Sequence, residues 1–312
     1  MSDISVIARH AVTVLAGQLA VMAFGVTDTI VAGRFSADAL AALSVASAVF
    51  VSVYVSLMGV LQALLPVWAE QHGRGETAAI GQSFRQSLYL AAAASVLGMG
   101  VLLFPEPLLR LTEVPDAMRE SVRDYLIIVG WALPSALFFR LYTTLNQALG
   151  RPQLVTWIQV GALVLKVPLS IWFTFGGWGI APQGAAGCAW ATLLVDYAIA
   201  IAAVVLMRTQ GFYRPLHLWQ RLEAPDWPRL REFLRLGIPA GLAIGVEVTS
   251  FTLVALFVAR QGTLSAASHQ IAANLAAVCY MLPLSLGIAV SARASWWRGQ
   301  GQELRAQQVA WL

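Results

Sequence analysis

Residues 237–259 read GIPAGLAIGVEVTSFTLVALFVA, an apolar run whose single charged residue is Glu247. At about 1.5 Å per residue, a helix of this length crosses a hydrocarbon core of about 30 Å. A charged residue at that depth costs about 2.5–3.5 kcal/mol on insertion scales, and membrane proteins that keep one generally use it. A second acid, Asp28, lies near the outer end of the first apolar run. Acids inside two membrane helices indicate ion-coupled transport.

The composition excludes a soluble domain. Of the 312 residues, 58% are hydrophobic and 12% are charged, whereas a soluble domain carries about 25% charge. The apolar runs also argue against a nucleic-acid partner, although the net charge is +4. Cys188 and Cys279 lie in apolar runs and predict no disulfide. No metal-ligand spacing or nucleophile–base cluster is visible, so we expect neither a metalloprotein nor an enzyme.

Long apolar segments with internal Gly and Pro predict an all-α integral membrane protein rather than a barrel. Polar connectors separate them. The predicted membrane helices are 11–33, 39–69, 87–104, 122–149, 153–175, 184–207, 237–259 and 265–297.

The arginines orient this bundle. With the N-terminus inside, the inner segments hold thirteen arginines and the outer segments hold five. The positive-inside rule then predicts a cytoplasmic N-terminus, in a multi-pass protein of the bacterial inner membrane.

An internal repeat divides the chain. A shift of 226 positions aligns Tyr54 with Tyr280 and Gly73 with Gly299. This predicts an N-lobe of six helices over 1–208, an inter-lobe loop over 209–236 with an interfacial amphipathic segment, and the start of a C-lobe over 237–312. Two helices of the second copy are present, so the chain reads as a twelve-helix protein truncated after its eighth helix.

Two segments carry a family resemblance. The first is GQLAVMAFGVTDTIVAGRFSADALAALSVA, which begins at Gly17. The second is LGIPAGLAIGVEVTSFTLVALFVARQGTLSAASHQIAAN, which begins at Leu236. Together with LNQALGRPQ they resemble the multidrug and toxic compound extrusion (MATE) transporters, and the intramembrane glutamate resembles the NorM-like branch.

The resemblance implies two six-helix lobes around a central cavity, and export of amphipathic organic cations driven by Na⁺ or H⁺. It implies no cofactor beyond that coupling ion, and we expect a monomer in the lipid bilayer. Asp28 matches the N-lobe acid and Glu247 the C-lobe acid, where Na⁺ would be held. Gln270 matches the helix-eight glutamine near that site, and Gln18 the polar residue on helix one.

The fifth helix departs from the family pattern N-x-P-x-N. Lys166 and Ser170 stand at these two positions, which share one helix face. We expect both to line the N-lobe cavity, with Lys166 either a counter-ion of Asp28 or a site residue. Asp196 and Arg140 match no motif and are expected to be structural.

Three alternatives remain at this stage. A lipid-linked oligosaccharide flippase of the same superfamily would need several basic residues for a pyrophosphate, and Lys166 and Arg140 are the two available. A membrane-embedded enzyme would need a reactive cluster. The chain could also be a fragment that does not transport.

Overall fold

The computed structural model describes residues 3–107, 116–177, 179–259 and 263–311, without the side chains of 116–117, 252–253, 255–256, 259, 263–271 and 274. Within these residues the chain is helical almost throughout. The helices are α1 (Asp3–Phe35), α2 (Ala37–Gln62), α3 (Leu65–Gly73), α4 (Thr77–Leu103), α6 (Asp116–Ala148), α7 (Pro152–Phe175), α8 (Ala185–Thr209), the 3₁₀ helix η1 (Gly211–Leu216), α9 (Trp227–Ala259), α10 (Thr263–Gly299) and α11 (Glu303–Ala310). The described chain contains eight helical stretches long and apolar enough to cross a membrane, which confirms the predicted all-α membrane fold.

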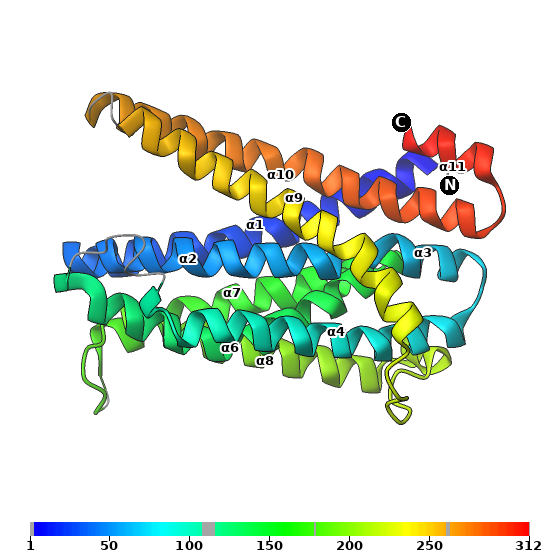
Figure 1. Cartoon of the computed structure of the whole chain (residues 1–312), viewed down its shortest axis with the longest axis horizontal. Helices are drawn as coiled ribbons and strands as arrows, with labels where there is room; N and C mark the ends of the chain where they lie inside the picture. Colours follow the sequence, from blue (N-terminus) through cyan, green and yellow to red (C-terminus); the bar gives the residue numbers. More distant parts are fainter. Residues whose placement is uncertain (1–2, 108–115, 178, 260–262, 312) are drawn as a thin grey trace.

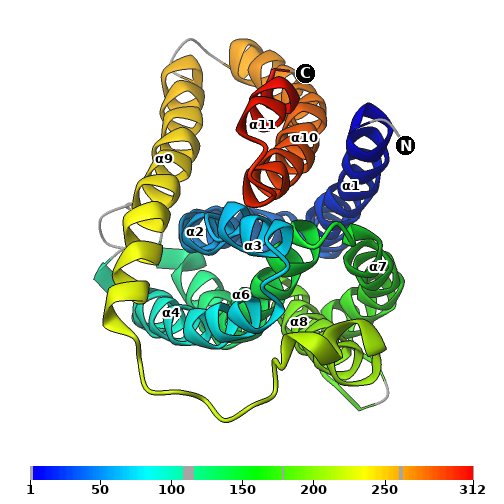
Figure 2. The same cartoon turned by 90° about the vertical axis from the view of Figure 1, so that its right-hand side faces the viewer.

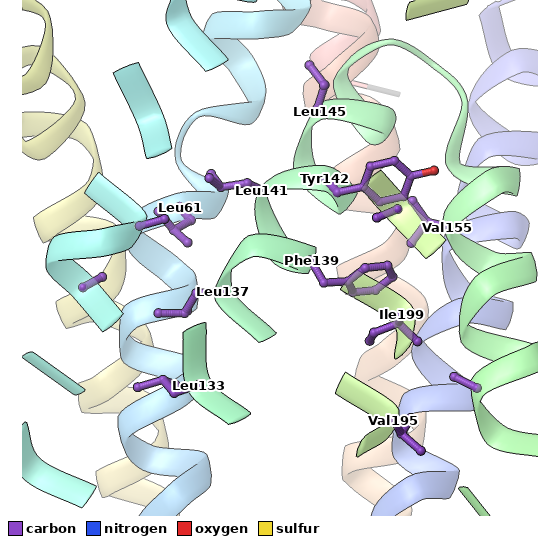
Figure 3. Close-up of a cluster of buried hydrophobic side chains, with 14 of the residues drawn as sticks. Leu61, Leu133, Leu137, Phe139, Leu141, Tyr142, Leu145, Val155, Val195 and Ile199 are labelled. Carbon is purple, nitrogen blue, oxygen red and sulfur yellow. The ribbon is translucent and has the colours of Figure 1, made fainter. Parts of the chain in front are cut away.

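Helix α6 is the centre of a bundle that also contains α1, α2, α4, α7 and α8 (Figure 2). In the most apolar 18-residue stretch of α6, 72% is buried inside the structure. The corresponding share in the other candidate membrane helices is 17–44%. Its Leu137 and Leu141 pack in the core cluster beside Leu61 of α2 (Figure 3). The outer surfaces carry exposed apolar side chains such as Val96 and Val164, as expected where lipid replaces water.

Helix α7 buries its polar side and exposes its apolar side. Its buried positions recur every three or four residues, the spacing of one helix face. They are Pro152, Val155, Gln159, Ala162, Lys166, Ser170 and Thr174. Lipid solvates the apolar side chains of such a helix, so its polar face turns toward the bundle interior. Because the polar face of α7 is turned inward, Lys166 and Ser170 lie inside the helical bundle.

Helices α9 and α10 form a separate pair that lies across α1, α2 and α3 (Figures 1 and 2). Close contact is made toward the end that carries α3 and α11. There the backbone of α9 at Gly237 and Gly241 packs against Ser56 and Val60 of α2. Figure 1 shows the pair moving away from α1 and α2 toward the end at which α2 and α10 begin.

The 226-residue repeat of the sequence is present in the structure. Helix α10 begins and ends 226 residues after α2 and α3 respectively, and α11 begins 226 residues after α4. The turn between them is also repeated: Gly75 and Gly301 both have φ +74°. In each copy the backbone N–H of this glycine donates to the carbonyl three residues earlier, His72 in one and Arg298 in the other. Two copies of one helical unit therefore build both parts of the molecule.

The C-terminal part of the predicted inter-lobe segment 209–236 is helical. Residues 227–236 continue directly into the membrane helix as the first turns of α9. Residues before them are fastened to the N-terminal bundle: Glu223 Oε1 lies 2.6 Å from the Arg85 guanidinium, and the Tyr213 hydroxyl donates to Asn146 at 2.6 Å.

The predicted single helix 39–69 is divided into α2 and α3. Ala63 and Leu64 form a turn between them, and Pro66 occupies the first turn of α3. Proline cannot donate an N–H to the preceding turn, so the helix is interrupted just before it. The repeated copy has Ala292 at this position, and α10 runs through without a break.

Candidate functional site

Asp28 of α1 forms a buried ion pair with Lys166 of α7. The distance from Lys166 Nζ to Asp28 Oδ2 is 2.9 Å, and the lysine side chain is 1% exposed. The Ser170 hydroxyl donates to the other carboxylate oxygen, Oδ1, at 3.0 Å. The predicted residues Asp28, Lys166 and Ser170 therefore form one connected set, and both carboxylate oxygens have a donor.

Helix α8 completes the coordination of the ammonium group. Lys166 Nζ lies 2.5 Å from Thr192 Oγ1 and 3.3 Å from the carbonyl oxygen of Cys188. An ammonium has three N–H donors, so with Asp28 all three are used. Full hydrogen bonding is what makes a buried ion pair tolerable, because its desolvation otherwise exceeds the attraction. The sequence analysis missed Thr192, although it stands on the same helix face as Cys188 and Asp196.

A second polar group lies further along the bundle interior. The Arg140 guanidinium of α6 donates to Gln62 of α2, and its Nε is buried without a hydrogen-bond partner. Arg140, expected to be structural, thus joins α6 to α2 through Gln62.

Gln18 lies apart from the Asp28 set. It is ten residues from Asp28 on the same helix, which is about 15 Å along the axis. It lines a small polar recess together with Thr143, Gln147, Thr156 and Gln159. The structure therefore places Gln18 at a different depth of the bundle from the other predicted N-lobe residues.

Glu247 of α9 is half-buried, and its carboxylate is hydrogen-bonded to the Tyr280 hydroxyl of α10. Among the described residues, no hydrogen bond or ion pair joins Glu247 to the Asp28 set. The side chain of the predicted partner Gln270 lies outside the part of the chain that the structure describes. Tyr280 was recognised in the sequence as a repeat position but not as a partner of the acid.

Together these observations define a polytopic α-helical membrane protein whose two helical units each hold an ionisable centre within the membrane. The MatE family matches residues 14–172 and 239–311. The chain belongs to the MatE family.

Relatives of this chain carry multidrug-resistance names. A probable multidrug resistance protein NorM from Aromatoleum aromaticum is 39% identical over 90% of this chain and 61% of the relative. One of the same name from Chromobacterium violaceum is 33% identical over 97% of this chain and 66% of the relative. The chain thus spans just under two thirds of the length of these relatives.

Solved structures share the fold. A structure of the MATE transporter NorM-NG, in a complex that includes a monobody, matches with a TM-score of 0.77 and 25% identity, over 96% of this chain and 65% of that one. The eukaryotic MATE transporter AtDTX14 matches with a TM-score of 0.86 over 99% of this chain and 69% of that one. At 17% identity the second likeness concerns the fold alone. These matches confirm the MATE-like architecture.

Proposed function

We propose that this chain belongs to a cation-coupled exporter of amphipathic organic cations in the bacterial inner membrane. The observation that carries the proposal is the placement of two acids: Asp28 is ion-paired inside the N-terminal bundle, and Glu247 is half-exposed on the separate α9–α10 pair. A carboxylate at membrane depth is costly unless it is paired or used, and Glu247 has only a hydroxyl partner among the described residues.

The arrangement of the two units supports alternating access. They touch at one end, where Arg293 of α10 binds Asp3 of α1 at 2.6 Å and Gly73 packs on Gly299. They diverge toward the other end (Figure 1). The excess of arginine favours a cytoplasmic location for the closed end and the N-terminus. In this orientation the arrangement opens outward, and rocking about the closed end would expose the opposite face.

The coupling step follows from competition for negative charge. In the outward-open form an external Na⁺ or H⁺ binds the Glu247 carboxylate, and the organic cation loses its electrostatic attraction and dissociates. The cation-bound form then closes outward and reopens to the cytoplasm, where the ion leaves. Such a ligand shifts the equilibrium by the difference in its affinity for the two states. The same carboxylate must therefore be reachable from both sides in turn.

A transport assay tests the proposal. The chain is reconstituted in liposomes, and uptake or efflux of tetraphenylphosphonium is followed under an imposed Na⁺ or H⁺ gradient. We expect gradient-driven transport in the native chain and its loss in Glu247→Gln, with unchanged incorporation. The matched control is Glu232→Gln in the same helix, whose exposed carboxylate lies outside the predicted membrane segment. Gradient-driven transport at native rates in Glu247→Gln would refute the coupling role.

The gradient identifies the ion. If a sodium gradient drives transport at equal internal and external pH, Glu247 exchanges Na⁺. If a proton gradient alone is effective, the glutamate is protonated and deprotonated during the cycle.

A further inference from the structure

A cavity of about 240 Å³ lies at the closed end of the molecule, the end that carries α3 and α11 (Figure 1). It is lined from both helical units: the N-terminal bundle contributes His10 of α1, His72 of α3 and the end of α6, and the second unit contributes Arg293 and Trp296 of α10. An apolar cavity of about 150 Å³ already holds benzene. This cavity therefore has room for a ring-sized molecule with a polar group attached.

The charged lining of the cavity has one sign. Among the described residues that line it none is acidic, whereas Arg293 is a permanent cation and His10 and His72 are imidazoles. Asp3 binds Arg293 at 2.6 Å and also lies 3.4 Å from Arg305. One carboxylate thus faces two guanidinium groups, and a surplus positive charge stands beside the cavity. Such a surplus attracts an anion.

Arg293 keeps hydrogen-bonding capacity toward that anion. Its Nε and one Nη lie 2.8 and 2.6 Å from Asp3 Oδ1. A guanidinium has five N–H donors, so three are left, and no hydrogen bond between described residues uses them. The guanidinium carbon is 4.4 Å from the ring centroid of Trp296 and 4.8 Å from that of Trp297. These cation–π contacts and Asp3 fix the group in place before a ligand arrives.

His10 supplies a second polar group. Its side chain is 8% exposed, and its Nε2 is buried without a hydrogen-bond partner among the described residues. A buried polar atom without a partner destabilises a protein, and each such atom calls for an explanation. Because His10 lines the cavity, a ligand there can bind this nitrogen.

The remaining lining suits an apolar body rather than a bare ion. Ile7, Leu149 and Ala289 present aliphatic side chains, and Trp296 presents a ring. Residues 148–150 stand at the C-terminus of α6, where the partial negative charge of the helix disfavours an anion. The anionic group is therefore expected at Arg293 and His10, with the apolar body beside the end of α6.

We propose that this cavity binds an amphipathic organic anion, a small apolar body that carries a phosphate, sulfonate or carboxylate group. His10 and Arg293 belong to different units, so the occupant bridges them and favours the form in which this end is closed. The site takes the charge opposite to that of the proposed cargo, and it shares no residue with the Asp28 set or Glu247. A soluble phosphomonoester and the headgroup of an anionic lipid both have this chemistry.

Binding of phenyl phosphate to the purified chain tests the site without an ion gradient. The chain is placed in phosphatidylcholine nanodiscs and titrated by calorimetry at neutral pH. We expect saturable binding that Arg293→Gln and His10→Phe each weaken about ten-fold or more, the scale of one hydrogen bond to a charged group. Inorganic phosphate lacks the apolar body and should bind more weakly. The matched control, Arg298→Gln, removes an exposed arginine of the same helix and should keep the native affinity.

Asp3→Asn separates anion recognition from the ion pair that joins the units. If Arg293 recognises the anion, this substitution removes a competing carboxylate, and binding should be at least as tight as in the native chain. If Arg293 serves only to hold Asp3, the two substitutions should weaken binding equally. Equal weakening by Asp3→Asn and Arg293→Gln would overturn the role of Arg293 in recognition.

The lipid composition of the discs distinguishes the two sources of the anion. In phosphatidylglycerol discs, with salt enough to screen the surface charge, weaker binding of phenyl phosphate identifies a lipid headgroup as the competing occupant. Unchanged binding identifies a soluble anion. Either result upholds the site.

Absence of saturable binding by the folded native chain, or native affinity in a folded Arg293→Gln protein, would overturn this inference and leave the proposed export intact. If Arg293→Gln does not fold, the native chain decides. Phenyl phosphate should then protect Arg293 from modification by phenylglyoxal, as measured by peptide mass spectrometry. Equal modification with and without phenyl phosphate would reject the site.

Discussion

Gly73 and Gly299, 226 residues apart and equivalent in the two repeats, lie backbone to backbone where the two helical units meet. A Cβ atom on Gly73 would be 3.1 Å from the Cα of Gly299 and 2.1 Å from the Trp296 carbonyl oxygen. A Cβ on Gly299 would be 2.1 Å from the Glu70 carbonyl oxygen. The backbones approach this closely because neither residue has a side chain, as in small-residue contacts of membrane helices.

Alanine at Gly299 should separate the two units at their closed end. We expect Gly299→Ala to lower stability by about 1–3 kcal/mol, the usual penalty for overpacking. Thermal unfolding in detergent measures this. The matched control is Gly287→Ala in the same helix, where an added Cβ meets nothing within 4 Å. Equal stabilities of the two variants would mean that the helices move apart to accommodate the added methyl group without a loss of stability.

The Asp28–Lys166 pair should show strong energetic coupling. Removing either partner leaves a buried, unpaired charge, which costs about 3–5 kcal/mol, whereas removing both leaves none. A double-mutant cycle with Asp28→Asn and Lys166→Met should therefore give a coupling energy of about 3 kcal/mol or more. The surface pair Glu70–Arg74 provides the comparison and should couple by less than about 1 kcal/mol. Additive effects of Asp28→Asn and Lys166→Met would contradict a stabilising pair.

Tyr280→Phe should alter the response of Glu247 to the coupling ion. The substitution removes the hydroxyl that is hydrogen-bonded to the carboxylate and keeps the ring. We expect the ion concentration for half-maximal transport to change about ten-fold or more, the scale of one hydrogen bond to a charged group. Tyr197→Phe on the lipid-facing side of α8 should leave it unchanged. If the Tyr280→Phe protein has the native ion dependence, the Tyr280 hydroxyl has no role in ion coupling.

The loop before α9 should detach when Glu223 is neutralised. Its hydrogen bond with Arg85 lowers the pKa of the Glu223 carboxyl below the ordinary value of 4.5. The attachment is therefore present at neutral pH and is lost as the pH falls through that lowered pKa. At neutral pH, Glu223→Gln should speed tryptic cleavage after the exposed Arg221. Glu232→Gln serves as the control, and equal cleavage of all three proteins would show that the loop is held by its other contacts.

Much of the fold could be predicted because lipid imposes a simple rule on sequence. Backbone groups in a hydrocarbon core must bond within the segment, so a long apolar run such as 237–259 predicts a helix. Inter-helix contacts do not follow from this rule. The anchoring of Glu223 on Arg85, for example, joins residues 138 positions apart and has no local pattern.

The candidate site was predictable only in part. Membrane depth singled out Asp28 and Glu247, since an acid in an apolar run is conspicuous. Asp196 was equally conspicuous but matched no motif, and its half-buried position depends on how the helices pack. Thr192 and Tyr280 are common residues in membrane helices, and their sequence context gave no reason to select them.

By itself the sequence determined the membrane class, the positions of the helices and the repeat, because hydropathy and glycine spacing act locally along the chain. Tertiary structure decided which charges are neutralised. Lys166 could have faced either of two acids, and the packing of α1, α7 and α8 gives its three donors to Asp28, Thr192 and Cys188. Electrostatic pairing depends on distances of a few ångströms between helices, and no pattern within a single helix encodes these distances.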